Sequence, residues 1–134
     1  MIFLFLNKNK KNQMSYLKLD IYTISFELFI AVHQLTFKLP KHELYELGSQ
    51  IRRSADSVNS NIVEGYGRRI YKADYLRFLT MSHGSCDETT NHLRKVIKLY
   101  PDIASEFQEI LNKYLLLGGK IYNYVEYVKN NWRT

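Results

Sequence analysis

The stretch that decides the fold is QIRRSADSVNSNIVEGYGRR, residues 50–69. It is rich in small and polar residues, yet apolar residues return every three or four positions. With two upstream leucines, the apolar positions are Leu44, Leu47, Ile51, Ala55, Val58 and Ile62. At 100° per residue they fall within an arc of about 80°. The stretch therefore predicts a helix with one narrow apolar seam.

Polar side chains border this seam, and they form either a site or a structural network. A polar group that is buried must find hydrogen-bond partners, because burial without them costs a few kcal/mol. We expect the next helix to supply those partners, so that the network fixes the helix register. We favour this interpretation over a catalytic site. The predicted network consists of Gln50, Arg53, Ser57, Asn61, Glu64, Ser85 and Glu88.

The rest of the chain predicts an all-α fold. Only two prolines and six glycines occur in 134 residues, and Asn-Gly and Asp-Gly hairpin signals are absent. Apolar periodicity predicts helices over about 20–38, 41–66, 71–100 and 102–130. Pro40 and Pro101 separate them, and Asp102 is the expected N-cap of the last helix. Short connections make successive helices antiparallel neighbours, which predicts an up-down four-helix bundle.

We expect the bundle to span residues 17–130, with a mobile basic tail at 1–16 and a short C-terminal end at 131–134. The tail begins with apolar residues and then lysines, whereas a secretory signal carries its positive charge first. No apolar run approaches the ~18 residues of a membrane span. The single cysteine, Cys86, cannot form an internal disulfide. These features predict a cytoplasmic protein without membrane contact.

The first helix is apolar on two faces, which a lone bundle does not need. One face carries Ile21, Leu28 and Val32, and the other carries aromatic residues. A second apolar face left in water would be a large exposed patch. We therefore predict self-association, although a curved bundle that buries more of this helix is the alternative. The predicted interface consists of Tyr22, Phe26, Phe29, Ile30, Leu116 and Tyr127.

Several motifs resemble one known family. The stretch reads Gln-hydrophobic-Arg-Arg-Ser, then Ser-hydrophobic, then Asn-Ile-x-Glu-Gly, and a Phe-Leu, a Gly-Ser and a Glu follow. The matching positions are Gln50, Arg52, Arg53, Ser54, Ser57, Val58, Asn61, Ile62, Glu64, Gly65, Phe78, Leu79, Gly84, Ser85 and Glu88. Over about residues 17–130 the chain resembles the 23S rRNA intervening-sequence proteins, often labelled S23-type ribosomal proteins. Val63, where the family usually has alanine, and the segment before Met14 depart from the pattern.

The resemblance implies an up-down four-helix bundle that assembles as a homopentamer. The family takes its name from genes inside intervening sequences of bacterial rRNA, which does not define a biochemical activity. More distantly, the chain is similar to the accessory variability determinant of diversity-generating retroelements. That protein is a basic pentameric bundle that binds nucleic acid and a reverse transcriptase. Its link to this chain is by analogy alone.

The net charge of +6 favours an acidic partner, and nucleic acid is the leading expectation, with RNA preferred over DNA. No base-reading motif is present, so we expect recognition of shape and backbone. A protein-partner scaffold, for example for a reverse transcriptase, is the alternative, and a partner gene nearby would discriminate the two. The candidate nucleic-acid-binding residues are Arg52, Arg68, Arg69, Lys72, Arg77, Arg94, Lys95 and Lys98.

Enzymatic signatures are weak. No Glu-x-x-His pair occurs, and Glu88 with His92 is a lone pair four residues apart, more often a surface hydrogen bond than a metal site. The sequence GYGRR lacks the lysine and strand of a phosphate-binding loop. The remaining histidines are scattered and make no triad. We therefore expect no catalytic residue, no metal and no cofactor.

Overall fold

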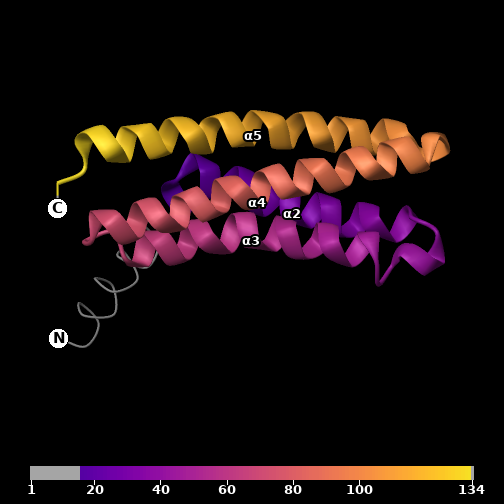
Figure 1. Ribbon diagram of the computed structural model, residues 1–134, viewed down its shortest axis with the longest axis horizontal. Coiled ribbons are helices and arrows are strands. Elements are labelled where there is room, and N and C mark those ends of the chain that lie inside the picture. The colour runs from indigo at the N-terminus through magenta and orange to yellow at the C-terminus, as the bar shows by residue number, and fades with distance from the viewer. Residues whose placement is uncertain (1–15, 134) are drawn as a thin grey trace.

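The computed structural model describes residues 16–133, and those residues contain helices and no strand. The α-helices are α2 (Asp20–Leu35), α3 (Leu47–Gly67), α4 (Lys72–Leu99) and α5 (Ala104–Asn131). Short 3-10 helices are η1 (Tyr16–Lys18), η2 (Thr36–Lys38), η3 (Lys41–Glu43) and η4 (Pro101–Ile103). The four long helices lie along the long axis of the molecule (Figure 1). The expected all-α four-helix bundle is confirmed, while most of the predicted tail, residues 1–15, lies outside the described residues.

The core is built from one buried stripe on each long helix. The seam predicted on α3 is fully buried at Ile51, Ala55, Val58 and Ile62. Leu44 lies before α3 begins and is only half-buried. The stripes of the other three helices meet this seam through Leu28, Val32, Tyr75, Leu79, Leu93, Val96, Phe107, Tyr114, Leu117 and Ile121.

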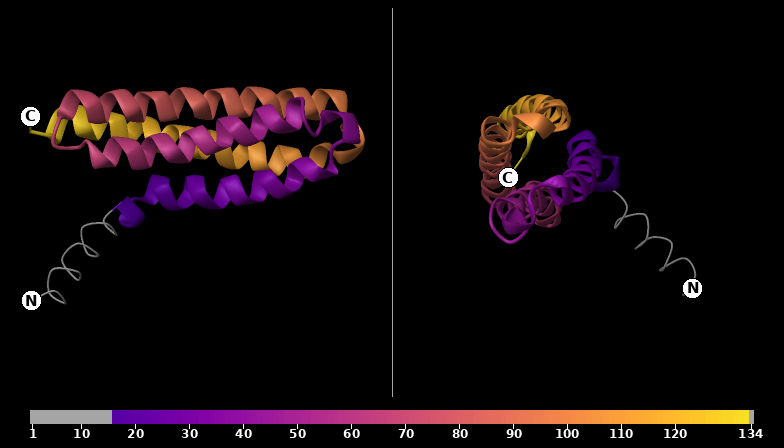
Figure 2. Two further views of the ribbon diagram at one scale, coloured as in Figure 1. Left: turned by 90° about the horizontal axis from the view of Figure 1, so that it is seen from below. Right: turned by 90° about the vertical axis from the view of Figure 1, so that its right-hand side faces the viewer.

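Helix α2 is the outlying member of the bundle (Figure 2). It packs on α3 and α5, and ion pairs to α5 hold both of its ends. Asp20 at its start accepts a bond of 2.7 Å from Lys120. Lys38, just beyond its end, lies 2.7 Å from Glu106. None of the helices among residues 16–133 is long and apolar enough to cross a membrane.

The second long helix begins at Leu47, not at Lys41 as predicted. Residues 41–43 form η3, and the backbone then leaves helical angles at Glu46 (φ −103°, ψ −104°). Contacts with other parts of the fold hold residues 41–46 in this conformation, and the apolar periodicity of the sequence does not reveal such contacts. A Cβ added to Gly48 would lie 2.9 Å from the carbonyl oxygen of Glu43, so the segment folds closely over the start of α3.

The outer helices also differ at their ends from the prediction. The first α-helix ends at Leu35 and continues to residue 38 only as a 3-10 turn. Asp102 lies in η4 and does not cap α5, whose N-cap is Ile103 without a side-chain bond. At the other end, the bundle continues past residue 130. Trp132 packs on Tyr75 with ring centroids 5.3 Å apart.

Candidate nucleic-acid interface

Polar side chains along the middle of α3 bond to α4. Ser57 Oγ and Ser85 Oγ lie 2.7 Å apart, and Asn61 donates to Ser57 Oγ at 2.9 Å. Two more hydroxyl bonds cross the same contact: Thr89 Oγ1 donates to Ser54 Oγ at 2.9 Å, and Ser82 Oγ donates to the Val58 carbonyl at 2.6 Å. These bonds satisfy buried polar groups and fix how α3 lies against α4.

Four residues of the predicted network lie outside it. Gln50, Arg53 and Glu64 are exposed, and among residues 16–133 no side-chain bond joins them to the seam. Arg53 and Glu64 lie on the same face of α3. They are eleven residues apart, which is roughly 16 Å along the helix axis, and this distance is too long for an ion pair. Glu88 contacts His92 instead, with 3.4 Å between Oε1 and Nε2. The structure therefore places these four residues outside the hydrogen-bonded network between α3 and α4.

The one cysteine of the chain, Cys86 on α4, is buried in packing. Cys86 is 1% exposed, and its thiol donates to the Tyr114 carbonyl at 3.3 Å. Burial raises the pKa of Cys86 to about 12, so the thiolate that a nucleophile requires is scarce at neutral pH. In the described part of the chain, no three His, Cys, Asp or Glu side chains gather as metal ligands.

Arg52 belongs to the fold rather than to a binding surface. Its guanidinium group donates to Thr36 Oγ1 at 2.8 Å and to the Leu44 carbonyl at 2.6 Å. It also lies over the Phe37 ring, 5.5 Å from the centroid. Arg52 thereby ties the end of α2 and the segment before α3 to α3 itself. We remove it from the candidate contact residues.

The other candidate cations separate into two clusters at opposite ends of α4. The turn cluster, Arg68, Arg69, Lys72 and Arg77, surrounds the connection from α3 to α4. The wall cluster, Arg94, Lys95 and Lys98, lies near the C-terminal end of α4. The seventeen residues from Arg77 to Arg94 span roughly 25 Å of helix. One short ligand therefore cannot contact both clusters on one protomer.

Cations of the turn cluster bond mainly to backbone carbonyls. Arg68 donates to the Glu64 carbonyl and Arg69 to the Tyr66 carbonyl, each at 2.9 Å. Lys72 donates to the carbonyl of Lys129 at 2.7 Å. These bonds satisfy carbonyls near helix C-termini, where cations are favourable. A carbonyl has no net charge, so the positive charges are not neutralised.

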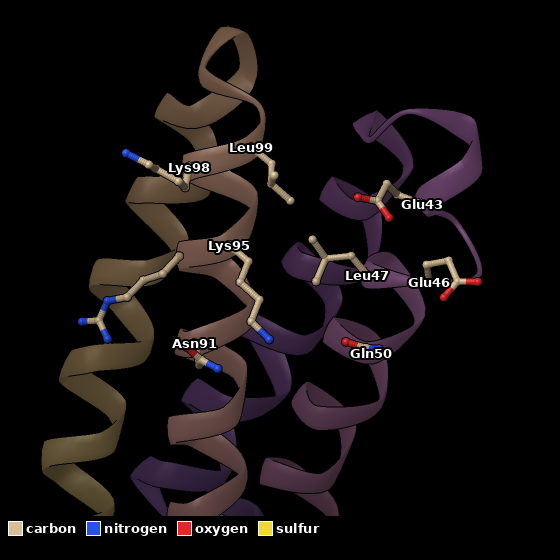
Figure 3. Close-up of a pocket in the computed structure, with 9 residues that line it drawn as sticks. Glu43, Glu46, Leu47, Gln50, Asn91, Lys95, Lys98 and Leu99 are labelled. Carbon is tan, nitrogen blue, oxygen red and sulfur yellow. The ribbon is translucent and has the colours of Figure 1, made fainter.

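The wall cluster lines a groove of about 600 Å³ between α3 and α4 (Figure 3). Glu43 and Glu46 stand on the opposite side, and Leu47 and Leu99 are the apolar residues among the lining. Within residues 16–133, no ion pair or hydrogen bond engages the charged groups of Arg94, Lys95 and Lys98. In Figure 3 Lys98 points away from the two glutamates, while Lys95 extends toward Gln50.

Two of these cations also face a second groove, on the α5 side of α4. Arg94 and Lys98 line this groove of about 570 Å³, together with Leu111 and Leu115. They therefore stand on the ridge between two grooves. A long polyanion lying across the ridge would meet both charges without entering either groove.

A family model described as 23S rRNA-intervening sequence protein matches residues 17–123. The chain belongs to this family. A comparison with the curated proteins finds no match. The matched range contains both basic clusters and the whole α3–α4 seam. Val63, which departs from the pattern in the motif stretch, is half-buried.

Proposed function

We propose that this protein is a non-enzymatic, cytoplasmic, oligomeric bundle that binds nucleic acid, with RNA preferred over DNA. The observation that carries the proposal is the wall cluster. Its three cations have no carboxylate within 4.0 Å in the described part of the chain, whereas Lys38, Lys113 and Lys129 each have one. Cations without internal partners remain available for phosphates, and arginine binds phosphate through two parallel donors.

The proposed bundle is up-down and antiparallel. Contacts between α4 and α5 support this direction, because Lys72 bonds near the end of α5 and Cys86 bonds to Tyr114 near its middle. The ion pairs of Lys38 with Glu106 and of Asp20 with Lys120 support it for α2 and α5. Residue numbers rise along one helix of each pair as they fall along the other.

Copies of the bundle are proposed to associate through α2 and α5, as a pentamer by resemblance to the family. Phe26 (46%) and Ile30 (43%) are exposed on α2, and Leu116 (71%) and Tyr127 (53%) on α5. Tyr22 and Phe29 are half-buried and pack against the core. Exposed apolar groups on two adjoining helices favour a protein contact. A ring would repeat the basic clusters and strengthen binding through multivalency.

A protein partner is the second candidate function, and the groove of Figure 3 supports it. Its glutamates would repel a polyanion that entered the groove, but an amphipathic protein segment could meet the acidic side and the basic side together. The two functions are separable, because polyanion binding depends steeply on salt.

The test titrates the protein into a labelled RNA hairpin and a matched DNA duplex, with fluorescence anisotropy followed across a salt series. The Arg94→Ala/Lys95→Ala/Lys98→Ala variant should bind more weakly than wild type. Its slope of log affinity against log salt should fall by roughly 2 to 3 for three lost phosphate contacts. A better fit to RNA should appear as tighter hairpin binding at equal salt.

The matched control is Lys38→Ala/Lys113→Ala/Lys129→Ala, which changes the net charge equally but removes cations that already have carboxylate partners. It should retain most of the affinity and slope. Equal losses in both triple variants would show that only net charge matters and would remove the wall cluster as the site. Failure of the wild type to bind either polymer at low salt would overturn the proposed function.

A further inference from the structure

The turn between α3 and α4 combines exposed aromatic surface with positive charge. Tyr71 is 63% exposed, and no hydrogen bond or ring contact within residues 16–133 engages its side chain. Its backbone is nevertheless fixed, because its N–H donates to the Arg68 carbonyl at 2.9 Å and its carbonyl accepts from Tyr75 at 3.0 Å. Tyr71 is therefore an aromatic ring open to solvent on a rigid support.

Two arginines are held beside this turn by a single phenylalanine. The guanidinium carbon of Arg68 lies 4.7 Å from the centroid of the Phe78 ring, and that of Arg77 lies 4.8 Å from it. Stacking on a ring orients a guanidinium group while leaving its donors open. Arg77 has a distant carboxylate partner in Asp74 at 3.8 Å, and Arg68 has only a carbonyl. Two weakly neutralised positive groups are thus oriented at the same end of the bundle as Tyr71.

We propose that this turn binds an unpaired segment of RNA, with a base stacked on Tyr71 and neighbouring phosphates at Arg68 and Arg77. A base in a duplex has no free face, whereas an unpaired base can stack on an aromatic side chain. Every base has such a face, so the contact tolerates sequence changes, consistent with the absence of a base-reading motif. The inference rests on the proposed function and assigns the unpaired part of the RNA to this turn.

The opposite end of the bundle offers a natural comparison. Tyr45 is more exposed than Tyr71, at 82%, but it lies between Glu43 and Glu46 in the sequence. Those carboxylates repel phosphates, so exposure of an aromatic ring does not by itself make a stacking site. Tyr45→Ala is therefore a control matched in residue type and exposure, with the opposite charge around it.

The experiment measures binding of the full chain to a fluorescein-labelled RNA of roughly 12 nucleotides without self-complementarity, within the site sizes of known stacking surfaces. The same RNA paired with its complement is the second probe. We expect Tyr71→Ala to weaken single-strand binding roughly 5- to 100-fold and to change duplex binding less than about twofold. Tyr71→Phe and Tyr45→Ala should bind both probes as wild type does.

Tyr71→Trp provides a second measurement, the fluorescence of the introduced indole, whose quenching by RNA would not result from a loss of folding. A stacked base should quench the new indole upon addition of single-stranded RNA, with wild type giving the background from Trp132. If wild type binds the duplex and Tyr71→Ala leaves single-strand binding unchanged, the stacking inference is wrong and the proposed function stands. Equal weakening of both probes by Tyr71→Ala would also overturn it. If wild type binds neither probe, both proposals fail.

Discussion

Gly65 on α3 and Phe78 on α4 are in such close contact that no larger residue fits at position 65. A Cβ added to Gly65 would lie 2.9 Å from the Cβ of Phe78 and 3.3 Å from Cδ1 of Tyr75. Carbon atoms normally approach to about 3.5–4.0 Å. The glycine therefore permits the two helices to meet next to the turn that presents Tyr71. It also positions Phe78, whose ring orients Arg68 and Arg77.

Gly65→Ala should lower the free energy of unfolding by about 1–3 kcal/mol, because the added methyl group overpacks a filled contact. Gly84→Ala is the matched change on α4, where, apart from the adjacent backbone of the same helix, no atom of residues 16–133 lies within 4 Å of the added Cβ. That variant should be more stable by about 1 kcal/mol, because alanine favours the helix interior. Urea denaturation of both variants measures the difference. Equal effects at the two glycines would contradict the close-contact explanation.

Tyr114→Phe should stabilise the protein by about 1 kcal/mol. The Tyr114 hydroxyl is buried and finds no hydrogen-bond partner among residues 16–133, so its removal eliminates a desolvation cost. Tyr75→Phe is the contrasting change, because the Tyr75 hydroxyl lies 2.7 Å from that of Tyr124. Its loss should cost about 1 kcal/mol. The denaturant midpoint of each variant measures these effects, provided that the dependence of unfolding free energy on denaturant concentration is unchanged. Destabilisation by Tyr114→Phe would show that the Tyr114 hydroxyl does have a partner.

The protein should lose stability as the pH rises above about 10. Burial raises the pKa of Tyr75 and of Tyr114 in the folded protein, with the Tyr124 hydrogen bond contributing at Tyr75. Above the ordinary pKa, the unfolded chain loses these protons while the folded protein keeps them. The contribution is fully present below pH 10 and decreases by about 1.4 kcal/mol per pH unit for each tyrosine. Denaturation curves from pH 9 to about 11.5 measure the slope, and Tyr114→Phe should flatten it.

Phe26→Glu combined with Leu116→Glu should convert the proposed oligomer to monomers. Each substitution places a charge on an apolar side chain that we assign to the subunit contact, where an unpaired charge is costly. Tyr45→Glu is the control, because Tyr45 is 82% exposed and lies outside the predicted interface. Sedimentation velocity measures the mass of each variant. A wild-type monomer at micromolar concentration would contradict self-association, and an intact oligomer in the double variant would place the contact elsewhere.

The seam of α3 was predictable because its physical basis is local. Ile51, Ala55, Val58 and Ile62 repeat at helical spacing, and all four are fully buried. The start of that helix was not predictable in the same way. Leu44 continues the apolar spacing upstream of α3, but a close approach of Gly48 to the Glu43 carbonyl and the two bonds of Arg52 hold the segment in another conformation. These contacts join residues whose proximity exists only after folding.

The candidate interface was likewise predictable only in part. The sequence identified the basic residues, yet it did not separate Arg52, which bonds internally, from Arg94, which has no partner in the described chain. It also did not single out Tyr71 as an exposed ring at the end of the bundle where Phe78 orients two arginines. A signal did exist in the run Arg68 to Lys72, where an aromatic residue interrupts basic ones at the start of the third predicted helix.

The sequence by itself determined that the chain is helical, where its four long helices lie apart from the start of the second, and which face of each is apolar. Those properties follow from spacing along one helix, where neighbours in space are three or four residues apart. The tertiary structure alone decided which polar groups satisfy one another and which charges remain free. Such pairings depend on distances between helices, as Ser57 with Ser85 and Lys72 with Lys129 illustrate. No periodicity within a single helix contains those distances.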